Sequence, residues 1–383
     1  MDFRVQEYDL RKTFTIEKKL LLLIGVYPSS RKIAHFSGTF LNLFVSVTQI
    51  ISMTVQLIID GTDKNLSKVS ESLQYFTTLA TFMCKFINFV WYKKVLLEIE
   101  DALTLSVLYD HSNHCFDLLQ QKISTCRIVG KVFRIMVIGA VSLYGLTPYL
   151  DPEKHKTLPI PGWFPYNVND YYYLTFAYQM VGVVNTAYTN STIDILTWLL
   201  ISVASGQFEI LKENLRRIDY GNENVQETNH SFEKCVNHHK EIVRLVYKIE
   251  QMFSKGIFLQ FFNSVIAICF TGFMMIIVPP FSLQFCFLVM YFLCVMLQIA
   301  MYCWYGHDVM TTSSTIGESF YMSNWYKSDL AIRRNVTIFL EKTKKPVCLT
   351  AGGFVTLSLT TLTGILRSSY SYFAVLQHIY AKS

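Results

Sequence analysis

Long runs without a single charged residue are the feature that most constrains this chain. Gly256 to Gly306 contains no Asp, Glu, Lys or Arg, and neither does Ile33 to Ile59. An uncharged apolar run of 18 or more residues is typical of a helix that crosses a bilayer. Charged residues make up only 16% of the chain, against about a quarter in soluble domains. The sequence therefore predicts an integral membrane protein.

The apolar runs are sufficient for seven helical spans in an all-α fold. Pro279 and Pro280 divide the longest run in two, because paired prolines end a helix. We expect a cytoplasmic N-terminus with a short interfacial helix (1–32), spans one to four (33–205), cytoplasmic amphipathic helices (206–255), spans five and six (256–306), a cytoplasmic loop or helix (307–346), a seventh span (347–379) and a short outer tail (380–383).

Lys and Arg predict the orientation, since cytoplasmic loops hold an excess of them. The segments before span one and after spans two, four and six lie on one side of the membrane and together hold 25 of these residues. The segments on the other side hold five. We therefore expect an inverted topology, with the N-terminus in the cytoplasm and the C-terminus outside. That topology is opposite to that of a G-protein-coupled receptor. Asn65 is the only sequon asparagine in an expected outer loop, so it is the candidate glycosylation site.

The long cytoplasmic segments have helical periodicity. Apolar residues between Phe232 and Phe253 recur at helical spacing, with charged residues on the opposite face, and a second such segment runs from Phe208 to Ile218. Helices of this kind need a partner. They are expected to pack with one another or with other subunits; the alternative is a solvated linker.

The residues do not indicate an enzyme. The nine cysteines show no metal-ligand spacing, and there is no phosphate loop, nucleophile elbow or pair of catalytic carboxylates. We therefore expect no metal and no cofactor. The net charge of +6 is explained by the cytoplasmic loops and requires no nucleic-acid partner.

Three charged residues lie deep within the expected spans: Lys85, Asp194 and Arg367. Such residues are costly in a bilayer unless they are paired or in contact with water. We expect Arg367 to pair with Asp194 or to lie beside water in a pore. Lys85 is expected to extend its ammonium group to the inner interface.

Several separated motifs resemble those of the insect odorant receptors and occur in the same order. They are LLLLIGVYP from Leu20, YGHDVMTTSSTIGESFYMSNWY from Tyr305, Lys345-Pro346, Thr350 to Gly352, and SYSYFAVL from Ser369. The resemblance implies an odour-gated cation channel in the plasma membrane of sensory dendrites, surrounded by lipid. It also implies a heterotetramer with the shared odorant receptor co-receptor. The chain lacks the long insertion that the co-receptor carries before span five, so it resembles the variable, odour-binding subunit.

The family places its ligand in the outer half of the bundle, among spans two, three, four and six. Candidate residues for a site of this kind are Phe76, Thr77, Ser142, Gly145, Tyr149, Phe176, Met180 and Tyr291. Ser142, Gly145 and Tyr149 share one helical face by their spacing. Each of the eight residues could equally serve in ordinary packing.

The last span carries a stripe of small and hydroxylated residues that becomes apolar near its outer end. Its members, three or four residues apart, are Thr361, Gly364, Ser368, Ser371, Val375 and Ile379. The resemblance implies that this span lines the pore, with the gate at Val375 and Ile379. His378 stands where the related pattern has Gln. A gustatory-type channel and a metabotropic seven-span receptor remain the alternative functions.

Overall fold

The computed structural model describes residues 10–27, 32–62, 66–109, 113–150, 158–220 and 225–380. These residues include seven helices of 22 residues or more: α2 (Lys32–Thr62), α3 (Leu66–Trp91), α6 (Asn113–Leu150), α7 (Tyr172–Arg217), α8 (Val225–Ile277), α9 (Leu283–Ser314) and α12 (Leu359–Tyr380). The all-α prediction is confirmed. Asn65, the predicted glycosylation site, lies outside the described residues.

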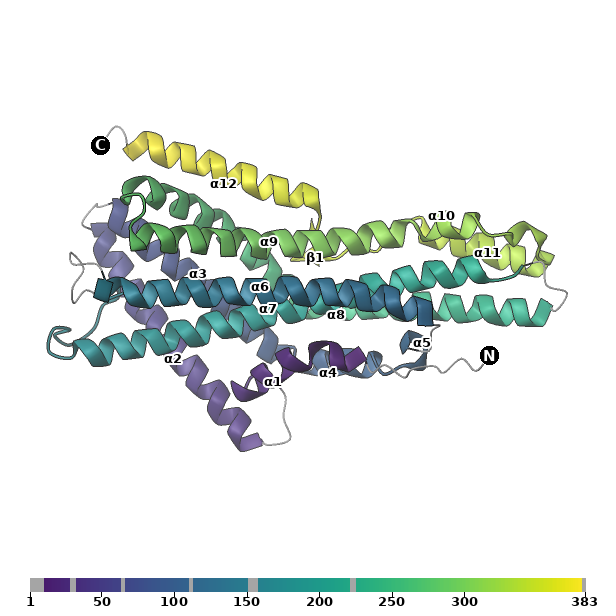
Figure 1. The fold of residues 1–383 in the computed structure, drawn as a ribbon, viewed down its shortest axis with the longest axis horizontal. Helices are drawn as coiled ribbons and strands as arrows, with labels where there is room; N and C mark the ends of the chain where they lie inside the picture. The colour runs from purple at the N-terminus through teal and green to yellow at the C-terminus, as the bar shows by residue number, and fades with distance from the viewer. Residues whose placement is uncertain are drawn as a thin grey trace.

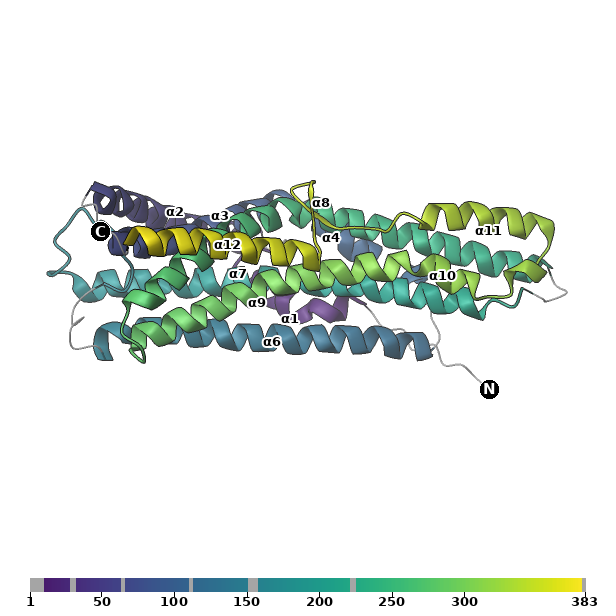
Figure 2. The same ribbon diagram turned by 90° about the horizontal axis from the view of Figure 1, so that it is seen from above.

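Shorter elements connect the long helices. They are η1 (Leu10–Phe14), α1 (Thr15–Leu23), α4 (Lys93–Ala102), α5 (Ser106–Tyr109), α10 (Ile316–Tyr321), η3 (Trp325–Lys327), α11 (Leu330–Thr343) and a two-stranded hairpin of β1 (Thr350–Ala351) and β2 (Val355–Thr356). The bundle is elongated, with α6, α7, α8 and α9 running along its length (Figures 1 and 2). α10 and α11 lie at the end opposite the C-terminus.

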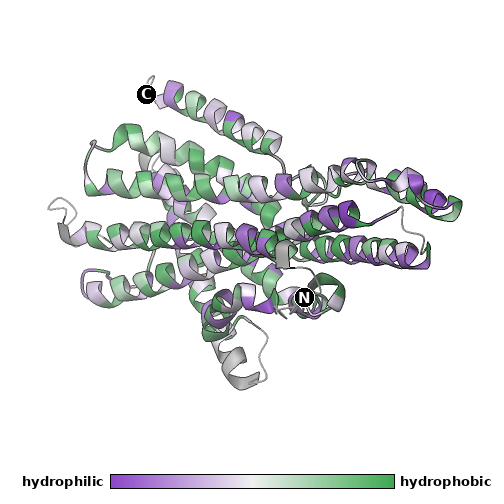
Figure 3. Cartoon of the chain, turned by 45° about the vertical axis from the view of Figure 1, so that its right-hand side comes forward, coloured by the Kyte–Doolittle hydropathy of each residue, from purple (hydrophilic) through white to green (hydrophobic). Residues whose placement is uncertain are grey.

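Five of the described helices are long and apolar enough to cross a membrane. They cover Gly38–Thr62, Cys115–Pro148, Tyr172–Arg217, Val225–Ile277 and Leu283–Tyr321. Helices suit this role because every backbone hydrogen bond is made within the segment. Hydrophilic residues gather toward the end of the bundle that carries α10 and α11, whereas the other half is largely hydrophobic (Figure 3).

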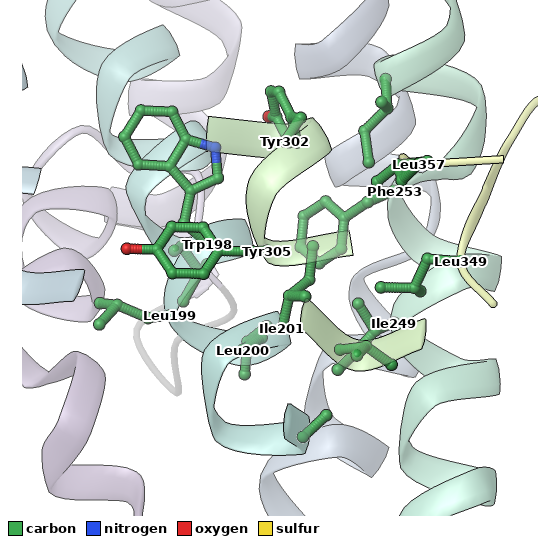
Figure 4. Close-up of a cluster of buried hydrophobic side chains, with 14 of the residues drawn as sticks. Trp198, Leu199, Leu200, Ile201, Ile249, Phe253, Tyr302, Tyr305, Leu349 and Leu357 are labelled. Carbon is green, nitrogen blue, oxygen red and sulfur yellow. The ribbon is translucent and has the colours of Figure 1, made fainter. Parts of the chain in front are cut away.

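Helix α7 is the central element of the bundle. Every residue from Ser191 to Phe208 is buried, and α6, α8 and α9 all pack along it. A helix that is buried all round must satisfy or avoid polar groups on every face. Trp198 from α7 packs between Phe133 and Tyr302, with ring centroids 5.1 and 6.0 Å away. Figure 4 shows this cluster where α7, α8 and α9 meet the segment that leads to α12.

Several helix boundaries agree with the sequence-based predictions. α8 ends at Ile277 and α9 begins at Leu283, so the two prolines do separate the fifth and sixth spans. The predicted amphipathic segments are continuations of longer helices, because α7 runs unbroken to Arg217 and α8 begins at Val225. The third span is likewise part of a longer helix, α6.

The seventh span begins later than predicted. Residues 347–358 are not helical, and the helix starts at Leu359. Gly352 and Gly353 have φ of +66° and +85°, which is the left-handed conformation that a tight hairpin turn requires. The Gly352 N–H donates to the Ser254 carbonyl at 3.0 Å, so the hairpin is fixed to α8 before α12 begins.

Gly306 lets this segment approach α9 closely. A Cβ at this position would lie 2.9 Å from the Leu357 carbonyl oxygen and would also overlap the Leu357 side chain. Leu357 is completely buried. The direction in which α12 leaves the bundle therefore depends on the absence of a side chain at Gly306.

Candidate functional site

A cavity of about 180 Å³ lies among the long helices of the bundle. Residues from α2, α3, α6, α7, α8 and α9 border it, together with Ile160 from the loop between α6 and α7. Its walls are mainly apolar, with a few amide and hydroxyl groups. Enclosed apolar cavities with few polar groups are typical of sites for small molecules.

One wall of the cavity is a group of aromatic rings. Tyr144 from α6 packs against Tyr75 from α3 and Phe287 from α9, with ring centroids 5.3 and 4.8 Å away. Tyr291 lies one turn further along α9, 6.1 Å from Phe287. Tilted and offset arrangements at these separations are favourable. The rings provide a large apolar surface with well-defined geometry.

The described part of the loop between α6 and α7 covers the cavity. The Tyr144 hydroxyl donates to the Pro159 carbonyl at 2.5 Å, and Gln179 from α7 both donates to and accepts from the backbone of Ile160, at 3.0 and 3.3 Å. On the other side, the Ser52 hydroxyl of α2 donates to the Trp163 carbonyl at 2.7 Å. The cover is thus fixed to three helices.

The cavity floor is polar and leads to a buried ion pair. Gln260 from α8 donates from Nε2 to Gln298 Oε1 on α9 at 2.8 Å. Gln298 in turn donates from Nε2 to Asp194 Oδ2. Asp194 also accepts from the Tyr302 hydroxyl at 2.6 Å and from Lys85 Nζ at 2.6 Å. Four helices therefore contribute to one connected network below the cavity.

The predicted pairing of Arg367 with Asp194 is wrong, and so is the predicted extension of Lys85 to the interface. Lys85 lies on the same buried face of α3 as Phe82 and Phe89, which points into the bundle. It therefore meets Asp194 at the same depth. Arg367 is exposed, because α12 packs through the face that contains Ile365 and Ser369.

Two of the eight predicted ligand residues, Thr77 and Tyr291, line the cavity. The other described ones do not. Ser142 is exposed. A Cβ at Gly145 would lie 2.7 Å from Met180 Cε, so Gly145 and Met180 pack α6 against α7 instead. Phe176 packs on Tyr172, and Phe76 is half-buried outside the cavity. The side chain of Tyr149 lies outside the part that the structure describes.

The cavity uses a different face of α6 from the one predicted. Its α6 residues are Phe133, Val137, Ala140, Val141 and Tyr144. Four of these recur at spacings of four, three and four, which is a regular helical stripe. This periodicity can be read from the sequence, but an apolar stripe is equally typical of a helix face that only packs against its neighbours. Nothing in the sequence around Gln260 and Gln298 indicates that they border a cavity.

The predicted pore stripe faces away from the rest of the chain. Gly364, Ser368, Ser371 and His378 are all exposed, as are Val375 and Ile379, whose exposed fractions are 55% and 52%. Thr361, half-buried, donates from its hydroxyl to the Thr356 carbonyl at 2.6 Å. Helix α12 packs on α8 and α9 through its opposite face. The stripe is thus available to another subunit or to water.

Comparison with known proteins identifies the family. The sequence profile described as 7tm Odorant receptor matches residues 65–370. This chain belongs to the insect odorant receptor family. It is similar to Odorant receptor 85c of Drosophila melanogaster, with 26% identity over 77% of this chain and 78% of that protein. It is also similar to Odorant receptor Or1 of Anopheles gambiae, with 25% identity over 98% and 97% of the two chains.

The fold agrees with a solved member of this group. The structure of the insect olfactory receptor OR5 from Machilis hrabei in complex with eugenol superposes with a TM-score of 0.86, at 15% identity, over 97% of this chain and 98% of that one. The predicted seven-span membrane fold and the assignment to a receptor family rather than an enzyme are confirmed. The odorant receptor described here is therefore a multi-pass membrane protein.

Proposed function

We propose that this odorant receptor is the odour-binding subunit of a ligand-gated cation channel. The observation that carries the proposal is the mainly apolar cavity among α2, α3 and α6 to α9, in a member of a family of odorant receptors. Its volume and aromatic wall suit a small volatile molecule. We propose that such a molecule binds there in the outer half of the bundle.

The channel function is supported by α12. Its outward face carries small and hydroxylated residues from Gly364 to Ser371 and ends in Val375 and Ile379. Four such helices around a central axis would form a polar pathway with an apolar constriction, and an apolar constriction excludes water until it widens. We propose a heterotetramer with the odorant receptor co-receptor that conducts cations with little selectivity. Arg367 would then lie beside the water of the pore.

The proposed topology has the N-terminus in the cytoplasm and the C-terminus outside. It follows from the distribution of Lys and Arg. α10, α11 and the adjoining ends of α7 and α8 would then form a cytoplasmic unit that contacts other subunits. Epitope tags at the two ends test this arrangement. The N-terminal tag should bind antibody only after the cells are permeabilised, and the C-terminal tag in intact cells.

Current recordings test the function. Cells that express the chain with the co-receptor should show ligand-evoked cation currents with a panel of volatile molecules, within milliseconds and with G-protein signalling blocked. Cells that express a cavity-filled variant such as Ala140→Leu should show weaker responses at equal surface expression. A response that requires G proteins, or a cytoplasmic C-terminus, would favour a metabotropic receptor. A response to non-volatile tastants without the co-receptor would favour a gustatory-type channel.

A further inference from the structure

Three residues that line the cavity each carry a side-chain oxygen without a hydrogen-bond partner. Gln260, Asn190 and Thr186 line the cavity, and among the described residues Gln260 Oε1, Asn190 Oδ1 and Thr186 Oγ1 are buried atoms with no hydrogen-bond partner. Buried polar atoms in native structures almost always have a partner, so each of these oxygens requires an explanation. A ligand that donates a hydrogen bond is one explanation that the cavity itself suggests.

The orientation of Gln260 is determined by the ion pair below it. A carboxylate can only accept hydrogen bonds, so Gln298 must turn its Nε2 toward Asp194 and its Oε1 away. That Oε1 accepts from Gln260 Nε2 at 2.8 Å. Gln260 Nε2 also donates to Ser264 Oγ at 3.0 Å. Rotating either amide would place two oxygens against each other. The unpaired atom of the Gln260 amide is therefore its carbonyl oxygen.

Three hydrogen-bond donors on the walls are used within the protein. Thr78 donates to the Gln74 carbonyl at 2.9 Å, so the Tyr291 hydroxyl, 2.6 Å from Thr78 Oγ1, is the donor of that pair. The Tyr144 hydroxyl donates to the Pro159 carbonyl. Asn263 Nδ2 donates to Thr81 Oγ1 at 2.6 Å. The Gln260 and Asn190 side-chain oxygens, by contrast, are acceptors without a partner.

We propose that this cavity selects small molecules that carry a hydroxyl group, such as aliphatic alcohols and phenols, over aldehydes and ethers of the same size. The ligand hydroxyl donates to Gln260 Oε1, and its apolar body lies against the aromatic wall. The proposal rests on the proposed function of the cavity as the odour site. A cavity of about 150 Å³ holds benzene, so the 180 Å³ here suits ligands of about seven to ten non-hydrogen atoms.

Matched ligands test the selectivity directly. Each hydroxyl compound in a panel is compared with an aldehyde and an ether that have the same number of non-hydrogen atoms, for example benzyl alcohol with benzaldehyde and anisole. The first measurement is the thermal stabilisation of the detergent-solubilised receptor, since a ligand that binds the folded state raises the midpoint by an amount that grows with the logarithm of its affinity. The second is the ligand-evoked current with the co-receptor. We expect the hydroxyl compounds to bind at least about 10-fold more tightly than their partners.

The variant Gln260→Met removes the acceptor and keeps an unbranched side chain of similar length. It should reduce the preference for alcohols to about 2-fold or less while ethers bind as before. Gln298→Met is a second variant, which frees Gln260 to rotate and so should also admit aldehydes. The matched control is Gln251→Met, an exposed position on the same helix, which should keep the full preference.

The outcomes separate this inference from the proposed function. Equal binding of alcohols and ethers, or an undiminished preference in folded Gln260→Met protein, would overturn the hydroxyl selectivity while leaving the cavity as the odour site. Preferential binding of alcohols without any current would support the selectivity and overturn the channel proposal. Absence of binding by every volatile molecule in the panel would overturn both.

Discussion

Lys85 Nζ lies 2.6 Å from Asp194 Oδ1, and the exposed fractions of the two side chains are 3% and 0%. The pair joins α3 to α7 at the centre of the bundle. Tyr302 and Gln298 from α9 supply two further hydrogen bonds to the same carboxylate. A buried ion pair is tolerated only when its remaining hydrogen-bonding capacity is satisfied. Asp194 is therefore the point at which three helices are held in register.

Removal of one partner of this pair should be strongly destabilising. Lys85→Met leaves the Asp194 carboxylate buried and unpaired, which we expect to cost about 3–5 kcal/mol. The double variant Lys85→Met with Asp194→Leu should recover much of this loss, because no unpaired charge remains. The measurement is the thermal midpoint of the detergent-solubilised receptor, with surface expression as a second readout.

Arg367→Met is the control for the ion pair. Arg367 is exposed on α12, so its replacement should change the free energy of unfolding by no more than about 0.5 kcal/mol, as ordinary surface substitutions do, and leave the thermal midpoint nearly unchanged. The charge exchange Asp194→Arg with Arg367→Asp should not restore folding. Rescue by that exchange would contradict the pairing of Asp194 with Lys85.

A larger side chain inside the cavity should reduce odour sensitivity. Ala140 lines the cavity from α6 and is buried. Ala140→Leu should lower ligand affinity by about 10-fold or more, since the added atoms occupy volume that the ligand requires, at a packing cost of about 1–3 kcal/mol. Ser142→Leu, two residues away on the exposed side of α6, should not change it. Dose–response curves at matched surface expression provide the comparison; equal effects of both variants would argue against the cavity as the ligand site.

A side chain at Gly306 should displace the segment that leads to α12. The Cβ of Gly306→Ala would overlap the buried Leu357, so we expect a loss of about 1–3 kcal/mol in stability and weaker gating. Gly61→Ala is the matched helical control, because nothing lies within 4 Å of a Cβ there. Gly61→Ala should be neutral or slightly stabilising. Tolerance of Gly306→Ala with a normal thermal midpoint would contradict the close approach of these segments.

Apolar periodicity and length were sufficient to predict the helices, because each long uncharged run has one stable conformation in a bilayer. Pro279 and Pro280 predicted the turn between α8 and α9, because proline lacks a backbone N–H and ends a helix when it occurs beyond the first turn. The hairpin before α12 was missed. It depends on contacts of Gly352 with Ser254, nearly a hundred residues earlier, and such contacts leave no local pattern.

The partners of the charged residues inside the bundle could not be predicted from one sequence either. Lys85, Asp194 and Arg367 were recognised as exceptional, yet their partners depend on how α3, α7 and α12 are rotated about their axes. The same rotation decides which face of α6 borders the cavity. The predicted face, with Ser142 and Gly145, contains plausible residue types, but it packs elsewhere.

The outward face of α12 ends in two apolar residues. Val375 and Ile379 are one helical turn apart, and both are exposed in the single chain. In a membrane, exposed hydroxyls on a helix also serve as contacts between helices. The order of the stripe favours a pore, because a polar stretch is followed toward the C-terminus by an apolar pair, as a dewetting gate requires.

Val375→Ser should therefore raise the current that flows without ligand or alter the ion permeability ratio, because a hydroxyl at the constriction lets water remain in the closed state. His378→Ala should change permeability more than odour sensitivity, since His378 is exposed on α12 and distant in sequence from every residue that lines the cavity. Reversal potentials and basal currents in cells that also express the co-receptor provide the measurement. Phe373→Leu, on the half-buried side of α12, is the control and should leave both quantities unchanged. If Val375→Ser and His378→Ala assemble normally with wild-type basal current and permeability, this face of α12 does not line the pore.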